Sequence, residues 1–191
     1  SFPIIHRKKP KVTHEEFIPY LADPEDDVPP MASFGDGYRW HVTGLTHNDW
    51  GFPTNEPAEI GKKHLRLVRK IDRFRDDIVK YDLEQAEDAE ILVVSYGCVA
   101  RSAVRAVREA RAKGIKVGHF RPITLWPFPD KELIRVAGMA KKVIVPELNC
   151  GQMVSEVRIA LGAKAEIIPS NLVNGEILRP HEILATIEEV A

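Results

Sequence analysis

The chain has 191 residues, which accommodate one ordinary domain with a substantial extension or two small domains. Apolar residues make up 44% of it, enough for a sizeable core, and the formal net charge of −1 gives no overall field that favours nucleic acid or an anionic membrane. Two cysteines exclude a disulfide framework, and no apolar run approaches the roughly 20 residues that span a bilayer, so we expect a cytoplasmic protein.

The first part of the chain, residues 1–57, has no regular apolar period and is rich in proline. Proline removes a backbone donor and fixes φ, which disfavours long helices and central strands here. The segment also carries aromatic side chains that need a surface to pack on, namely Phe17, Tyr20, Phe34, Tyr38 and Trp40. We therefore predict an extended, irregular arm over residues 1–57 that lies on its own domain or on a partner.

Two histidines stand close together in the arm, within the stretch WHVTGLTHNDWG. His41 and His47 are six residues apart, and Asp49 follows. A metal site needs three or four converging ligands, and this spacing matches no standard zinc or iron pattern. Local hydrogen bonding and contact with a partner or a substrate cavity are the other interpretations of these side chains.

A helical pattern follows the arm. The apolar residues of this stretch recur at spacings of four and three, and they are Leu67, Ile71, Phe74, Ile78 and Tyr81. Such a stripe, with Asp, Arg and Lys on the other face, is typical of an amphipathic helix. We predict this helix over residues 58–82 and assign residues 58–85 as a linker.

From residue 86 onward, short apolar runs alternate with helical patterns. The predicted strands are EILVVSY, IKVGHF, KKVIVPE and AEIIPS, and the predicted helices cover residues 100–113, 130–140, 151–161 and 180–189. This alternation is typical of βαβ units. We therefore predict that residues 86–191 form a three-layer α/β domain, with an open, mostly parallel sheet and flanking helices.

The turn in VVSYGCVARSA, residues 93–103, has the strand-turn-helix layout of a phosphate cradle. It lacks the three glycines of a dinucleotide fingerprint and the pattern of a P-loop, because only Gly97 is present. Free N–H groups at the helix start, with Arg101 and Ser102, could still hold an anion. The alternative is a plain connector between strand and helix.

A second turn, in VPELNCGQMVSEV, follows the third predicted strand. Ligands bind at the carboxyl ends of parallel strands, so Glu147, Asn149 and Gln152 could face a partner or a site. The structural alternative is that Asn149 caps the next helix and Glu147 pairs with a lysine or an arginine.

The two cysteines, Cys98 and Cys150, both follow strand ends, so we expect them at the same edge of the sheet. They are either redox active or, as we expect, small buried side chains. The rigid loop RPITLWPFPDKEL, with Trp126, is either a docking surface or part of the core.

Three long strings, VPPMASFGDGYRWHVTGLTHNDWGFPT, DAEILVVSYGCVARSAVRAVREARAKGIKVGHFRPITLWPFP and VIVPELNCGQMVSEVRIAL, point to a family. They resemble the carboxyl-terminal portion of the alpha subunit of 2-oxoacid:ferredoxin oxidoreductases, in particular the 2-oxoglutarate type. The resemblance implies a fold like the transketolase carboxyl-terminal domain for residues 86–191. It also implies a complex that decarboxylates a 2-oxoacid on thiamine diphosphate with Mg²⁺, passes electrons through an iron–sulfur cluster to ferredoxin, and forms an acyl-coenzyme A.

For this chain the resemblance implies a part in assembly, with neither a catalytic residue nor a cofactor or metal bound by the chain alone. The implied partners are a beta subunit, with gamma and delta subunits as further candidates, and ferredoxin and coenzyme A through the complex. Because the chain starts at Ser1, we expect a piece of a longer protein that is inactive alone. Cys98 stands where this family usually has a serine.

The candidate ligand or interface residues are Gly97, Arg101, Ser102, Glu147, Asn149, Gln152, His41 and His47. One alternative to the enzyme subunit is a binding or regulatory module that docks a partner or an anion at the carboxyl edge of the sheet. A relative of transketolase or of a dehydrogenase E1 component is another, although the long strings fit that family less well.

Overall fold

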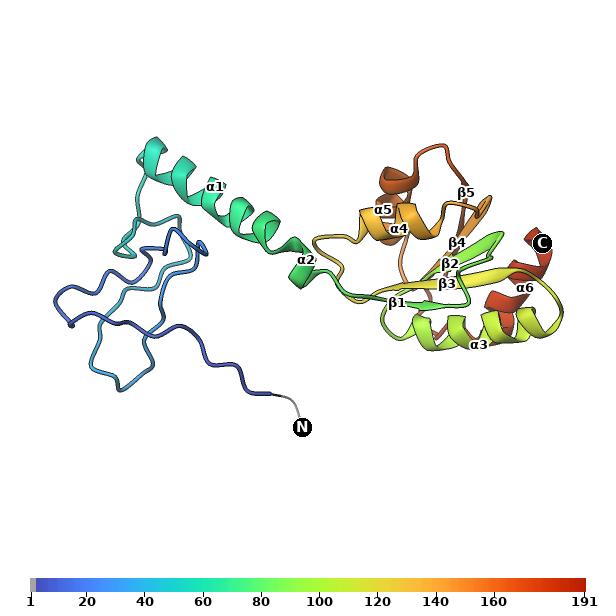
Figure 1. Ribbon diagram of the computed structural model, residues 1–191, viewed down its shortest axis with the longest axis horizontal. Helices are drawn as coiled ribbons and strands as arrows, with labels where there is room; N and C mark the ends of the chain where they lie inside the picture. The colour runs from blue at the N-terminus through green and yellow to red at the C-terminus, as the bar shows by residue number, and fades with distance from the viewer. Residues whose placement is uncertain (1–2) are drawn as a thin grey trace. The chain divides into compact units, whose positions relative to one another are not determined.

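The computed structural model describes residues 3–191 (Figure 1). The chain divides into two compact units, Ser1–Arg75 and Asp76–Ala191. In the first unit, residues 3–56 form turns and bends with one isolated bridge, between His47 and Pro53, and a long helix follows, α1 (Pro57–Arg73). Pro57 suits the first turn of α1, because the N–H that proline lacks has no helical partner there.

Helix α1 holds the arm with its charged face. Arg69 Nε donates to the Asp27 carboxylate at 2.9 Å, and Arg66 Nη1 donates to the Asp27 carbonyl oxygen at 2.7 Å. Asp27 itself is only 2% exposed. Leu67, from the predicted apolar stripe, is exposed, and no residue of α1 is buried. Ion pairs and hydrogen bonds to the arm, rather than apolar packing, thus fasten α1 within this unit.

The prediction of one helix through residue 82 was wrong at its end. α1 stops at Arg73, a short helix follows, α2 (Arg75–Ile78), and then a strand, β1 (Tyr81–Glu84). β1 pairs antiparallel with the neighbouring strand, and the Tyr81 ring stacks on Phe120 with ring centroids 5.4 Å apart. A sheet partner and an aromatic contact outweigh the helical spacing here.

The second unit alternates strands and helices as predicted. Its further elements are β2 (Ile91–Val94), α3 (Val99–Ala112), β3 (Val117–Pro122), α4 (Asp130–Val136), β4 (Lys142–Glu147), α5 (Gln152–Leu161), β5 (Glu166–Asn171) and α6 (Pro180–Val190). The strand order is β1-β3-β2-β4-β5, and every pairing except that of β1 is parallel. At the far edge, β5 pairs with β4 and places Pro169 opposite Val145.

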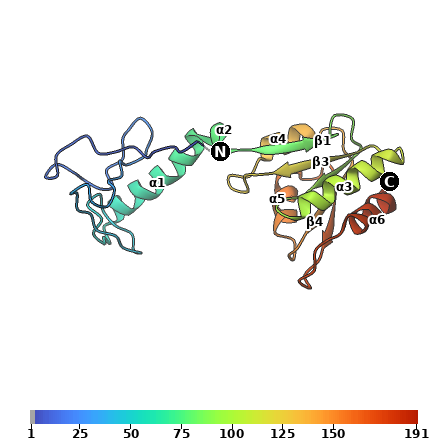
Figure 2. The same ribbon diagram turned by 90° about the horizontal axis from the view of Figure 1, so that it is seen from below.

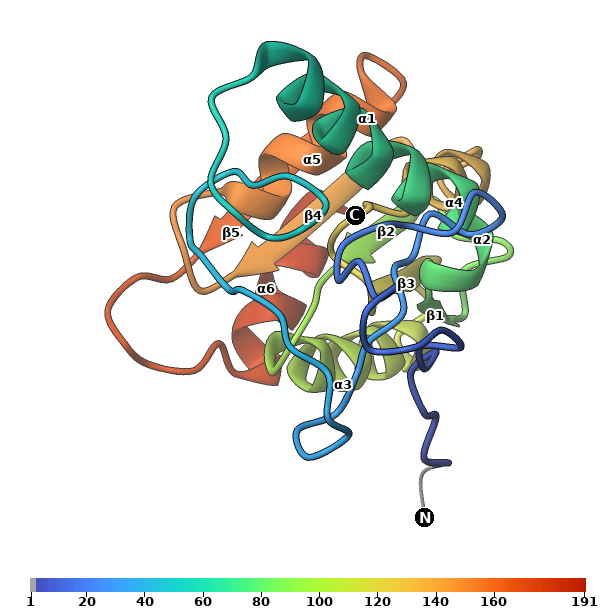
Figure 3. The same cartoon turned by 90° about the vertical axis from the view of Figure 1, so that its left-hand side faces the viewer.

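The sheet lies between two layers of helices, α4 and α5 on one face and α3 and α6 on the other (Figure 1). Figure 2 shows this unit from the side of α3 and α6. In Figure 3 the first pair lies above the strands and the second pair below them. All four residues of β2 are buried, because both of its faces are covered. Leu92 and Val94 belong to the core on the α4–α5 side, whereas Ile91 and Val93 belong to the core on the α3–α6 side. The predicted three-layer, mostly parallel fold is confirmed.

Candidate functional site

The loops that follow β2 and β4 meet at the carboxyl edge of the sheet. These strands are neighbours and run parallel, so their ends lie at the same edge. Asn149 Nδ2 donates a hydrogen bond of 2.8 Å to the Tyr96 hydroxyl and so joins the two loops. Tyr96, which the sequence analysis did not single out, is therefore part of this edge.

Asn149 organises the start of α5. Its Oδ1 accepts hydrogen bonds from the backbone N–H groups of Gly151 and Gln152, both at 2.9 Å, while Asn171 Nδ2 donates to its carbonyl oxygen at 2.6 Å. Gly151 has φ of 108°, a value that favours glycine. Gly151, and not Asn149 as expected, stands at the N-cap of α5, and Asn149 fixes the turn that leads into the helix. The Gln152 side chain is left exposed.

Glu147 is buried, with 1% exposure, at the end of β4. Its two carboxylate oxygens accept the backbone N–H groups of Met153 at 2.9 Å and Val154 at 3.2 Å. The expectation that Glu147 pairs with a lysine or an arginine was wrong, because the N-terminus of α5 supplies both donors and a favourable dipole. Burial raises the pKa of the nearby Tyr96 hydroxyl, and the negative charge of Glu147 raises it further.

The other predicted residues of this edge lie around α3. Gly97 is exposed with φ of 57°, Arg101 is exposed, and Ser102 is half-buried. Cys98 stands at the N-cap of α3 without a side-chain hydrogen bond to the helix. Within residues 3–191 the structure gives no side-chain hydrogen bond that would tie Arg101 or Ser102 to Asn149.

The expectation that both thiols are buried was wrong. Cys98 and Cys150 are both free and exposed, because the loops that carry them run over the surface beyond the strand ends. Among the described residues, no group of three or more His, Cys, Asp or Glu side chains is placed to hold a metal ion.

A buried polar pair, Ser95 and His119, was missed by the sequence analysis. Ser95 Oγ and His119 Nε2 are 2.7 Å apart, and the two residues are 0% and 1% exposed. Burial above all, together with the positive charge of Arg121, lowers the pKa of His119 to about 4. The imidazole is therefore neutral at physiological pH, and the pair links β3 to the end of β2. A histidine within the apolar run IKVGHF was the available signal.

The predicted histidines His41 and His47 belong to the unit Ser1–Arg75. His47 packs against Tyr20, with ring centroids 4.1 Å apart, and its Nδ1 lies 2.9 Å from the Asn48 carbonyl oxygen. His41 stacks on Phe52 at 5.0 Å, and its carbonyl oxygen accepts the Tyr20 hydroxyl at 2.9 Å. These contacts agree with the local-structure interpretation, and the roles of both residues toward a ligand or partner stay predictions.

The second unit of the chain matches a known domain family. Residues 89–183 match the model for pyruvate:ferredoxin oxidoreductase core domain II. Over 58% of its length the chain shares its fold with 40% of a split-gene transketolase in an inactive tetrameric form, at a TM-score of 0.51 and 17% identity.

The similarity to known relatives extends beyond core domain II. The 2-oxoglutarate synthase subunit KorA of Methanothermobacter thermautotrophicus is 46% identical over 181 residues, 93% of this chain and 47% of that protein. KorA of Methanocaldococcus jannaschii is 42% identical, over 96% of this chain and 48% of its own length. The chain thus spans about half the length of the curated relatives it matches.

A solved structure is similar over nearly the whole chain. This is the 2-oxoglutarate:ferredoxin oxidoreductase from Magnetococcus marinus with 2-oxoglutarate, coenzyme A and succinyl-CoA bound, at a TM-score of 0.82 and 29% identity over 98% of this chain and 33% of that one. The resemblance to the alpha subunit of 2-oxoacid:ferredoxin oxidoreductases is confirmed.

No helix among the described residues is long and apolar enough to cross a membrane.

Proposed function

We propose that this chain is part of the alpha subunit of a 2-oxoglutarate:ferredoxin oxidoreductase. The 46% identity to a 2-oxoglutarate synthase subunit, over 93% of the chain, carries the proposal. The complex would oxidise 2-oxoglutarate and coenzyme A to succinyl-CoA and CO₂, and ferredoxin would take up the two electrons.

The proposed complex uses thiamine diphosphate, Mg²⁺ and an iron–sulfur cluster, and the described residues at the carboxyl edge of the sheet do not fit a site for any of them. A cluster needs about four thiolate ligands, whereas Cys98 and Cys150 are the two thiols here. The polar groups that meet at the carboxyl edge are already used within the fold, since Glu147 and Asn149 hold the start of α5. We therefore assign this chain a structural role and propose that other parts of the complex bind the cofactors and carry out the reaction.

Exposed apolar side chains support a role in assembly. Trp126 is 72% exposed and Ile123 is 49% exposed, both in the loop after β3. On α1, Leu65 and Val68 are 69% and 57% exposed. Large apolar side chains at the surface, aromatic ones above all, are typical of interfaces. We propose the beta subunit as the partner of these surfaces, with gamma and delta subunits as further members of the complex.

Co-expression with the other subunits tests the proposal. The full-length protein that contains this chain is purified with its partner subunits and assayed with coenzyme A, ferredoxin and either 2-oxoglutarate or 2-oxoisovalerate. Ferredoxin reduction with 2-oxoglutarate is expected, and no turnover is expected from the 191-residue chain alone. A clear preference for 2-oxoisovalerate would overturn the substrate, and turnover by the chain alone would overturn the structural role.

A further inference from the structure

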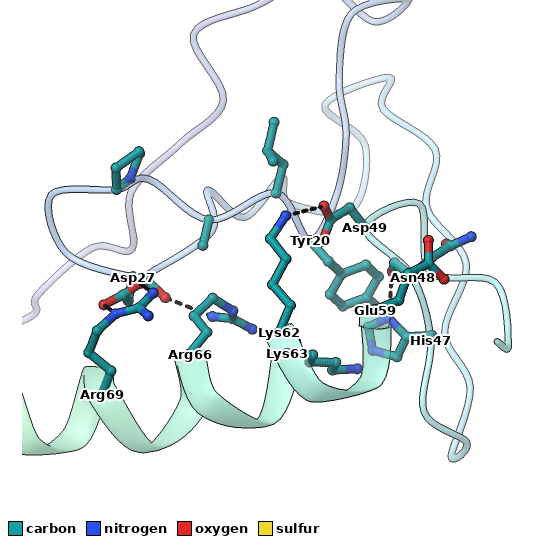
Figure 4. A pocket seen from close by; sticks show the side chains of 13 residues that line it. Tyr20, Asp27, His47, Asn48, Asp49, Glu59, Lys62, Lys63, Arg66 and Arg69 are labelled. Carbon is teal, nitrogen blue, oxygen red and sulfur yellow. Dashed lines mark hydrogen bonds and ion pairs between the residues drawn. The ribbon is translucent and has the colours of Figure 1, made fainter. Parts of the chain in front are cut away.

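A cavity of about 340 Å³ lies in the unit Ser1–Arg75, between α1 and the loops that hold Tyr20 and Asp49 (Figure 4). We propose that Lys63 and Arg66 form an anion site in this cavity that binds the phosphate group of a small phosphorylated metabolite. The site stands on this unit alone, so it does not depend on the proposed oxidoreductase function.

Most charged groups around the cavity already have partners. Arg69 donates to the Asp27 carboxylate at 2.9 Å, and Arg73 Nη1 lies 3.6 Å from the same carboxylate. Glu59 accepts the Thr54 hydroxyl at 2.7 Å. The Asp27 carboxylate thus contacts Arg69 and Arg73 directly, whereas the charge of Arg66 acts on it without an ion pair.

Among the described residues, Lys63 and Arg66 have no ion pair with a carboxylate. Arg66 Nη1 donates to the neutral Asp27 carbonyl oxygen at 2.7 Å, and the structure gives the Lys63 ammonium neither a hydrogen bond nor an ion pair among the described residues. Burial lowers the pKa of Lys63, the charge of Arg66 lowers it further, and Asp49 counteracts this in part. The lining of the cavity carries the cations Lys62, Lys63, Arg66 and Arg69 and the carboxylates Asp27, Asp49 and Glu59. Positive charge is therefore in excess in a partly desolvated pocket.

The arrangement suits a phosphate group. A guanidinium donates a planar fork to two oxygens of one anion, and a lysine adds a flexible point charge, which together match a compact dianion. The cavity is at the small end of the range for ligand pockets, roughly 300–1,000 Å³. The Lys62 ammonium also lines the cavity and lies 3.9 Å from the Asp49 carboxylate (Figure 4). A dicarboxylate carries similar charge, so the test compares the two.

Titration of the 191-residue chain with inorganic phosphate at constant ionic strength, followed by NMR, tests the site. We expect saturable binding that Lys63→Gln weakens about tenfold or more, because a lost ion pair of this kind contributes a tenfold or larger factor. Arg66→Gln should weaken it similarly. Lys70→Gln is the matched control, since Lys70 lies two turns further along α1 and outside the cavity.

Two further titrations distinguish the proposed site from the alternatives. In one experiment succinate replaces phosphate. In the other, Arg101→Ala, at the carboxyl edge of the sheet, replaces Lys63→Gln. Circular dichroism checks that each variant is folded. Saturation that is lost in Lys63→Gln and kept in Lys70→Gln and Arg101→Ala supports the proposal. Four outcomes would overturn the proposal. They are tighter binding of succinate than of phosphate, loss of phosphate binding in Arg101→Ala, undiminished phosphate binding in Lys63→Gln, and the absence of saturation.

Discussion

The carboxylate of Glu147, at the end of β4, accepts the backbone N–H of Met153 at 2.9 Å and so fastens strand β4 to the start of helix α5. The other carboxylate oxygen takes the N–H of Val154. One buried side chain thus satisfies two N–H groups of the first turn of α5, groups that have no partner within the helix. The carboxyl edge is held in place by this bond and by Asn149.

Substitution of Glu147 by glutamine should destabilise the second unit by about 2–3 kcal/mol. The amide keeps the shape but loses the charge and one acceptor, which leaves a buried N–H without a partner. Urea unfolding measures the change. The control is Glu156→Gln on the exposed side of α5, where the change should stay within about 0.5 kcal/mol. Equal effects of the two substitutions would contradict the assigned role.

The stability of the chain should fall with acid because of His119. Its pKa of about 4 in the folded state lies below the ordinary value of 6.5, so the unfolded chain binds more protons between these pH values. The contribution is complete above pH 6.5 and is lost as the pH falls toward 4, by about 2 kcal/mol at pH 5. Glu84 and Asp82 oppose the shift but do not cancel it.

The measurement is urea unfolding at pH 7 and pH 5. His119→Gln keeps a hydrogen-bonding group opposite Ser95 and does not titrate, so its stability should depend less on pH. His181→Gln, at an exposed position of α6, should behave as the unchanged chain. If His119→Gln and the unchanged chain lose the same stability between the two pH values, His119 is not the cause.

Loss of the Asp27 carboxylate should loosen the arm. The hydrogen bond from Arg69 lowers the pKa of Asp27, so this carboxylate is charged at neutral pH. Asp27→Asn removes the charge that two arginines share, and amide hydrogen exchange over residues 20–28 should become several-fold faster. Glu25→Gln, two residues away and exposed, is the control. Unchanged exchange in Asp27→Asn would show that other contacts hold the arm.

Gly118 in β3 should not tolerate alanine. A Cβ at this position would lie 2.7 Å from Ala86 Cα and 2.8 Å from the Gln85 carbonyl oxygen, both backbone atoms. The backbone would have to shift, at a cost of about 1–3 kcal/mol in the free energy of unfolding. Gly61→Ala in α1, where a Cβ meets no atom within 4 Å, should be neutral or stabilising by up to about 1 kcal/mol. Thermal unfolding of both variants compares the positions.

Trp126 should contribute to assembly rather than to folding. Its side chain is 72% exposed, so Trp126→Ser should change the stability of the chain by no more than about 0.5 kcal/mol. Recovery of the partner subunits during purification of the complex should drop, because a large aromatic anchor is lost. Met139→Ser, also at an exposed position, is the control. A complex that forms equally well with Trp126→Ser would contradict this role.

The sequence was sufficient to predict the parallel strands, because buried runs such as ILVV in β2 alternate with helical patterns. It was not sufficient for β1, whose four residues are half exposed and owe their strand conformation to a partner about forty positions away, β3. Glu147 was misread for a related reason. A buried carboxylate suggests a cationic side chain as its partner. The partners of Glu147 are backbone N–H groups, which cannot be predicted from residue types.

The contact between Asp27 and Arg69 spans 42 positions in the sequence and joins an irregular segment to a helix. Neither element has a period that would reveal it, because the turns that place Asp27 depend on the fold of the whole arm. Asp27 also has a φ of 59°, which aspartate tolerates better than most residues but which no local pattern demands. The candidate anion site beside it was therefore invisible before the structure.

Strand β5, at one edge of the sheet, carries Pro169, which has no backbone N–H to offer to a strand of another molecule. Edge strands tend to recruit strands of other molecules, and proline is one of the devices that proteins use against this. Pro169 offers no N–H, so a foreign strand laid along β5 could not form an uninterrupted ladder. Replacing it by valine would be expected to make the protein more prone to self-association at high concentration.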